Sequence, residues 1–171
     1  FLWQYKDGKE KVNWNEFFSY GGPVLLATLG LTSLYSSDII LVKHLFPAYE
    51  AGLYAALAVL GKIVFFVSGV VPAVMFPLVS ERFENGKNYQ KFFKTSFLIV
   101  GGESLLITAL YFSFPKLVIN LLYGSVYLTA APLLGIFAVF MALYSGCNLL
   151  INFFLSIGKT RLMVLPVLAA L

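Results

Sequence analysis

Three ionisable side chains, Asp38, Lys62 and Glu103, lie within long apolar stretches of the sequence. Such a group inside hydrocarbon costs several kcal/mol unless it faces water or a counter-charge, so it is usually functional. Lys62 and Glu103 each lie about eleven residues, or roughly 16 Å, into their stretches, which places both near the bilayer midplane. A buried lysine can bind an anionic group, and a carboxylate can bind a cation or a proton. These residues are therefore candidates to line a polar cavity.

The same three residues allow a second interpretation, in which opposite charges pair and hold helices together. Asp38 lies at a depth that overlaps with those of Lys62 and Glu103. Lys62 could therefore pair with either carboxylate, and the sequence does not choose between them.

Two of the apolar stretches also carry polar stripes. Asn148 and Asn152 belong to a stripe with Ser145 and Ser156, at steps of three and four residues that define one helix face. Both asparagines are candidates for the cavity wall, with interhelical hydrogen bonding as the alternative. A similar face consists of Thr28, Thr32, Tyr35 and Ser36. Asp38 lies about 100° or more around the helix from Thr32, so it does not share that face.

The composition of the whole chain requires a membrane. Of its 171 residues, 60% are hydrophobic and 12% charged, and the mean hydropathy is +0.86. A soluble domain carries about 25% charge, so this chain cannot solvate a globular surface. Hydrocarbon offers backbone groups no partner except one another, so the apolar stretches must be helices.

The apolar stretches predict an all-α, multi-pass transmembrane bundle with four complete helices. We expect a cytoplasmic or interfacial segment at 1–20 and the bundle over 21–171. The helices should cover about 21–46, 51–79, 92–114 and 130–155, each long enough to cross a bilayer. A fifth stretch, 161–171, reaches only about 15 Å, half of a hydrocarbon core. We therefore expect the chain to be part of a larger transporter.

The distribution of cations predicts the orientation. If four helices alternate, nine Lys and Arg residues fall in segments on one side, and only Lys43 and Lys116 fall on the other. The positive side of a membrane protein is cytoplasmic, so the amino-terminal segment should lie in the cytoplasm.

Prolines and small residues predict local features of the helices. Pro72 and Pro77 remove backbone donors, so they should kink or end the second helix. Small residues at helical spacing should form a close-packing face on the fourth helix. They are Ala131, Gly135, Ala138, Ala142 and Ser145.

Signals of enzymes, cofactors and metals are missing from the sequence. One cysteine, Cys147, and one histidine, His44, cannot make a disulfide framework or a multi-ligand metal cage. The glycine pairs lack the strand and helix of a nucleotide loop, and no activated nucleophile motif is present. We therefore expect no catalytic residue, no cofactor and no nucleic-acid partner.

Several short motifs resemble the polysaccharide flippases of the multidrug/oligosaccharidyl-lipid/polysaccharide exporter superfamily. In the second half of those proteins, an Asp-bearing helix precedes an acidic-x-Gly-x-Tyr turn, and a helix ending in Pro-x-x-Ser follows. The matching stretches here are Ser37–Val42, Glu50–Ala56 and Val74–Ser80, with further likeness at Leu122–Gly124, Tyr127, Ala130–Pro132 and Gly158–Lys159.

The resemblance implies a MATE-like fold of two lobes, of which this chain would be most of the second. It also implies export of a polyprenyl-diphosphate-linked glycan across the cytoplasmic membrane, with a central cationic cavity to which Lys62 would contribute. The partners would be this substrate, membrane lipids and the remaining lobe of the same protein. The alternatives are a drug or metabolite cation antiporter of the same superfamily, favoured by acidic residues, and a non-transporting membrane scaffold.

Overall fold

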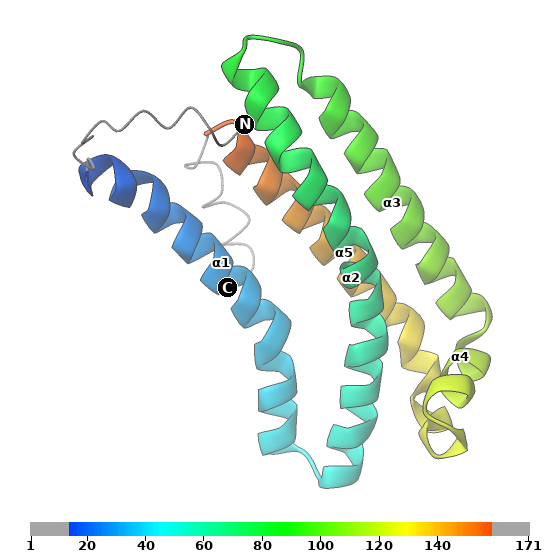
Figure 1. The fold of residues 1–171 in the computed structure, drawn as a ribbon. Helices are drawn as coiled ribbons and strands as arrows, with labels where there is room; N and C mark the ends of the chain where they lie inside the picture. Colours follow the sequence, from blue (N-terminus) through cyan, green and yellow to red (C-terminus); the bar gives the residue numbers. More distant parts are fainter. Residues whose placement is uncertain (1–13, 159–171) are drawn as a thin grey trace, which may run out of the picture.

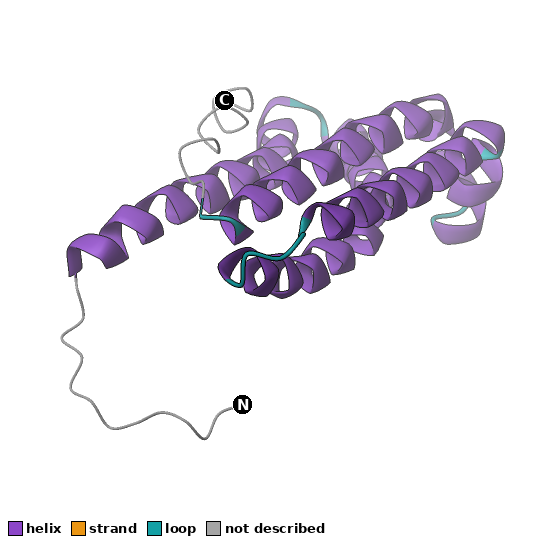
Figure 2. Ribbon diagram, turned by 90° about the horizontal axis from the view of Figure 1, so that it is seen from above, coloured by secondary structure: helices purple, strands orange, loops and turns teal. Residues whose placement is uncertain are grey.

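The computed structural model describes residues 14–158, and every regular element in that range is a helix (Figures 1 and 2). No strand occurs among the described residues, so the predicted all-α class is confirmed. The elements are α1 (Trp14–Leu45), α2 (Ala48–Glu84), α3 (Gln90–Ser113), α4 (Pro115–Leu122), the 3-10 helix η1 (Ser125–Ala130) and α5 (Ala131–Ser156).

The four predicted long helices correspond to α1, α2, α3 and α5. The largest difference is at α1, which already begins at Trp14 within the segment expected to be interfacial. The short helix α4 and the turn η1 were not predicted. Pro115 lies at the start of α4, where its missing N–H is not needed, and Gly124 adopts a φ of 84° between the two. The predicted fifth helix, 161–171, and residues 1–13 lie outside the described range.

α2 does not end at its prolines, so of the two predicted outcomes, a kink or an end, the end is excluded. The helix continues through Pro72 and Pro77 to Glu84, and then turns at Asn85 and Gly86, whose φ is 64°. Transmembrane helices tolerate proline because neighbouring helices and local adjustments satisfy the freed carbonyl groups. Pro72 is itself buried among such neighbours.

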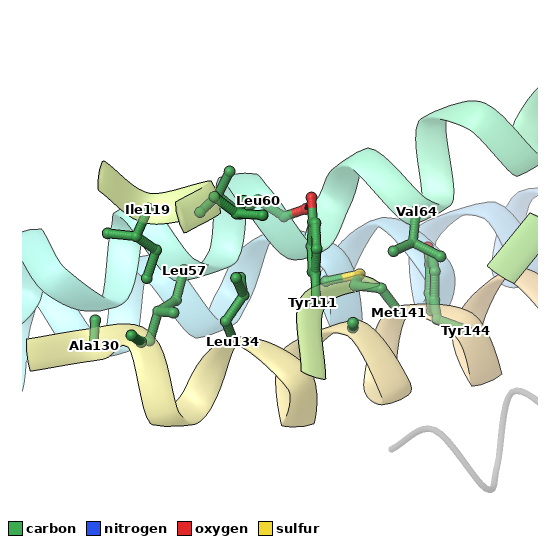
Figure 3. Close-up of a cluster of buried hydrophobic side chains, with 12 residues drawn as sticks. Leu57, Leu60, Val64, Tyr111, Ile119, Ala130, Leu134, Met141 and Tyr144 are labelled. Carbon is green, nitrogen blue, oxygen red and sulfur yellow. Dashed lines mark hydrogen bonds between the residues drawn. The ribbon is translucent and has the colours of Figure 1, made fainter. Parts of the chain in front are cut away.

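α2 packs against both α3 and α5 to form the core. One buried cluster contains Leu60, Leu134 and Met141, and the hydroxyl of Tyr111 on α3 donates to the Leu60 carbonyl of α2 at 3.0 Å (Figure 3). A Cβ atom on Gly61 would lie 3.3 Å from the Cβ of Phe137, so α2 and α5 approach closely there. The expected small-residue face of α5 is mostly buried in this core, with Ala131, Gly135, Ala138 and Ser145 buried and Ala142 half-buried.

The outside of the bundle is apolar. Large hydrophobic side chains such as Leu98, Leu105 and Leu143 are exposed on α3 and α5. Three helical segments are long and apolar enough to cross a membrane, namely Ala48–Glu84, Gln90–Ser113 and Ser125–Ser156. An apolar exterior over such segments fits a hydrocarbon solvent. α1 meets α2 at the Phe46–Pro47 turn and separates from it toward Trp14 (Figure 1).

Candidate polar cavity between three helices

Two residues from each polar stripe predicted from the sequence line one cavity. A space of about 240 Å³ lies between α1, α2 and α5. α1 contributes Thr28 and Thr32, and α5 contributes Asn148 and Asn152. The remaining lining residues are Phe65, Tyr144, Ile151 and Leu155. The structure therefore brings together hydroxyl and amide groups from helices that are far apart in the sequence.

The Thr28 hydroxyl and the Asn148–Asn152 pair are held by hydrogen bonds within their own helices. Asn152 Nδ2 donates to the carbonyl oxygen of Asn148 at 2.9 Å and to its Oδ1 at 3.1 Å. Thr28 Oγ1 donates to the Val24 carbonyl at 2.8 Å. An asparagine side chain offers two donors and two acceptor sites, so the oriented Asn148–Asn152 pair retains capacity to bind a polar ligand.

Lys62 lies on the side of α2 that faces α1. Its side chain is buried, with 6% of its surface exposed. Ala55, seven residues earlier and therefore on the same helix face, lines a space shared with Ile39 and Lys43 of α1. Phe65, one turn after Lys62, lines the polar cavity. Lys62 thus lies on the same side of α2 as Phe65, although it is not itself a lining residue of the cavity.

Asp38 binds Tyr54, the tyrosine of the acidic-x-Gly-x-Tyr motif, which was not predicted as a site residue. Its Oδ2 accepts a hydrogen bond from the hydroxyl of Tyr54 at 3.0 Å, which joins α1 to α2. Its Oδ1 is buried and has no hydrogen-bond partner in the described part of the chain. The bond shows that Asp38 and Tyr54 lie at the same height in the two helices. Lys62 lies eight residues, or about 12 Å along the axis, beyond Tyr54 and therefore beyond Asp38.

Glu103, on α3, lies at a different height along the bundle from Lys62 and beside a different face of α2. The hydroxyls of Ser68 and Ser104 are 3.4 Å apart, so Glu103 lies level with Gly69 of α2. That level is seven residues, or about 10 Å, from Lys62. Ser68, which faces α3, lies 120° around α2 from Lys62 at 100° per residue. Within residues 14–158, Oε1 of Glu103 is buried without a hydrogen-bond partner.

The three ionisable residues therefore do not form one cluster. Helix register separates Lys62 from both carboxylates by about two turns along the axis. Lys62 does not itself line the polar cavity, and the lining residue closest to it in the sequence is Phe65. Among the described residues, no group of three His, Cys, Asp or Glu side chains could hold a metal ion.

Replacing Tyr54 with phenylalanine should lower the free energy of unfolding by about 1 kcal/mol, because interhelical hydrogen bonds in membranes contribute roughly 0.6 to 1.7 kcal/mol. The change removes only the hydroxyl that donates to Asp38. Denaturant unfolding in detergent micelles would measure the difference. Tyr49→Phe is the matched control, since the Tyr49 hydroxyl makes only longer contacts of 3.4 and 3.5 Å. Equal losses in both variants would contradict a specific Asp38–Tyr54 bond.

Comparison with known proteins places this arrangement in a family. A family described as polysaccharide biosynthesis protein matches residues 2–132, which include α1 to α4 and η1. No curated protein and no solved structure matches the chain. The matched region carries the long membrane-spanning helices α2 and α3, so the chain is a membrane protein connected with polysaccharide biosynthesis or export. It belongs to the polysaccharide biosynthesis protein family.

Proposed function

We propose that this chain is part of a flippase that moves a lipid-linked oligosaccharide across the cytoplasmic membrane. Membership of the polysaccharide biosynthesis family supports a glycan substrate, and the apolar helices support a site within the bilayer. The chain would form most of the second lobe of a MATE-like transporter, with its amino-terminal segment in the cytoplasm. The remaining lobe would complete the substrate site.

The polar cavity is the observation that carries this proposal. It presents two amides and two hydroxyls between α1, α2 and α5, and Phe65 on its wall comes three residues after the buried Lys62. A diphosphate requires a cation, and sugar hydroxyls require neutral donors and acceptors. Asn148 and Asn152 supply the neutral groups, and Lys62 supplies the charge. α1 carries one wall of the cavity and separates from α2 toward Trp14, so movement of α1 would change access to it (Figure 1).

Reconstitution of the complete protein in vesicles would test this function. A polyprenyl-diphosphate-linked oligosaccharide with a fluorescent sugar is placed in both leaflets, and a membrane-impermeant reductant bleaches the outer half. We expect further bleaching as substrate crosses from the inner leaflet. Vesicles without protein are the first control, and a fluorescent phospholipid is the second. Bleaching that stays at the outer half, or that is equal for the phospholipid, would contradict a glycolipid flippase.

A cation antiporter is the second candidate, and the two carboxylates favour it. Asp38 and Glu103 each present a buried oxygen that has no hydrogen-bond partner in the described residues. Such an oxygen could bind a proton or a sodium ion that drives transport. Uptake of an organic cation by the same vesicles under a pH or sodium gradient would support this candidate. Glycolipid bleaching without such uptake would exclude it.

A further inference from the structure

A second cavity lies on the other side of the bundle, between α3 and α5. Its volume is about 490 Å³, within the range of small-molecule sites of roughly 300 to 1,000 Å³. Nearly all of its lining is apolar, and Leu105 and Leu143 on its walls are exposed at the outside of the bundle. It is therefore an open groove on the membrane-facing surface. It shares no lining residue with the polar cavity.

Aromatic contacts between the two helices lie beyond both ends of the groove. Beyond Phe97 and Leu150, the rings of Phe93 and Phe153 lie 4.2 Å apart between centroids. Beyond Thr108 and Val139, the ring of Phe112 packs so closely on Gly135 that a Cβ there would lie 2.6 Å from it. The groove therefore has a defined length along the helix axes.

The groove is about as long as one lipid acyl chain. From Phe97 to Thr108, α3 rises by about 16 Å, and half of a hydrocarbon core is about 15 Å. A transmembrane helix from another protein would need a groove along the whole bilayer. The groove extends past the predicted midplane near Glu103 but does not span the whole core, so it fits one extended acyl chain that enters from the α2–α3 end.

A lysine lies at the end of the groove where a lipid headgroup would be. Lys94 is exposed and comes three residues before Phe97 and seven before Gly101, so all three lie on one side of α3. It is also close to the α2–α3 loop, where Lys87 and Lys91 add positive charge. A cation at headgroup level above an apolar groove is complementary to an anionic phospholipid.

We propose that the groove between α3 and α5 is a binding site for an anionic glycerophospholipid. One acyl chain lies between the helices from Phe97 to Thr108, and the phosphate of the headgroup contacts Lys94. The lipid belongs to the leaflet on the side of the α2–α3 loop. This site is independent of the proposed transport function.

Photocrosslinking would test the site in the complete protein. The protein is reconstituted with phosphatidylglycerol or phosphatidylcholine, each carrying a photoreactive diazirine in mid-chain, and the labelled peptides are identified by mass spectrometry. We expect phosphatidylglycerol to label residues of the groove about fivefold more than phosphatidylcholine does. Lys94→Gln should abolish this preference, and Lys116→Gln, on α4, should leave it unchanged.

A space-filling variant provides a second test. A Cβ added at Gly146 meets nothing within 4 Å, so Gly146→Leu should fill the groove without disturbing the core. We expect this variant to lose labelling in the groove. Gly102→Leu is the matched control, because Gly102 is exposed, has equal space and lies outside the groove. Melting temperatures of both variants would verify that they fold.

Three results would overturn the proposal. The first is equal labelling of the groove by both lipids, and the second is unchanged labelling in Gly146→Leu. The third is rapid formation of an intermolecular Cys147 disulfide under copper phenanthroline. Cys147 lines the groove, so that disulfide would place a second copy of the chain there instead of a lipid.

Discussion

Replacing Lys62 with glutamine is expected to lower glycolipid translocation by about ten- to a hundredfold, because a hydrogen bond to a charged group contributes roughly 1.5 to 3 kcal/mol. The side chain is 6% exposed, and Phe65, three residues later on α2, lines the polar cavity. Glutamine retains most of the length and polarity of lysine but lacks its charge. The initial rate of bleaching at low substrate concentration, in vesicles of the complete protein, would measure the effect.

Two variants separate the loss of charge from other causes. Lys62→Arg keeps the positive charge and should retain most of the rate. Lys116→Gln removes an exposed charge on α4 and should leave the rate unchanged. A wild-type rate in Lys62→Gln, with an unchanged melting temperature, would show that Lys62 does not bind the diphosphate.

The long helices could be predicted because hydrocarbon permits few backbone structures. An apolar stretch of about 20 residues must be helical in a bilayer, and α2, α3 and α5 follow from that requirement alone. The start of α1 could not be found in this way, because the helix continues beyond its apolar part to Trp14. α4 was missed because eight residues are too few to span a membrane.

The prolines of α2 show that a local rule leaves two outcomes open, a kink or an end. In water, Pro72 and Pro77 would favour the end of a helix, since each removes a hydrogen bond and displaces a carbonyl. α2 nevertheless continues to Glu84 and packs against both α3 and α5. Contacts outside the helix decide this outcome, and they are not visible in the local sequence.

The polar residues of the candidate site were predictable, but their grouping was not. Spacing alone identified one helix face that contains Thr28 and Thr32. It identified a second face that contains Asn148 and Asn152. It could not show that α1 and α5 meet. It also suggested common depths for Lys62 and the carboxylates, whereas helix register separates them.

The Asp38–Tyr54 bond had a signal in the sequence that we did not use. Both residues lie eight positions from Phe46, one on each side, and a short turn at Phe46–Pro47 joins two antiparallel helices. Residues at equal distances from such a turn lie at equal heights. A tight helical hairpin can therefore reveal pairs across it when one member is charged and the other carries a hydroxyl.

Shortening Leu134 to alanine should lower the free energy of unfolding by about 2 kcal/mol, at the low end of the range for buried Leu→Ala changes. Leu134 is 0% exposed and belongs to the cluster between α2 and α5 (Figure 3). Lipid tails are as apolar as leucine, so transfer from lipid to the core contributes little. The loss therefore comes mainly from dispersion contacts across the cavity left behind. Denaturant unfolding in detergent micelles measures it.

The adjacent Leu133 is the matched control for this explanation. It lies on the same helix but is 49% exposed. In Leu133→Ala, lipid or detergent chains can refill much of the space, so the change in unfolding free energy should be well below 1 kcal/mol. Equal losses of unfolding free energy in the two variants would contradict the burial of Leu134. Truncation of a side chain that faces α2 would then destabilise the protein no more than truncation of one that faces lipid. A larger loss in Leu134→Ala supports packing, rather than exclusion from water, as the main force that joins these helices.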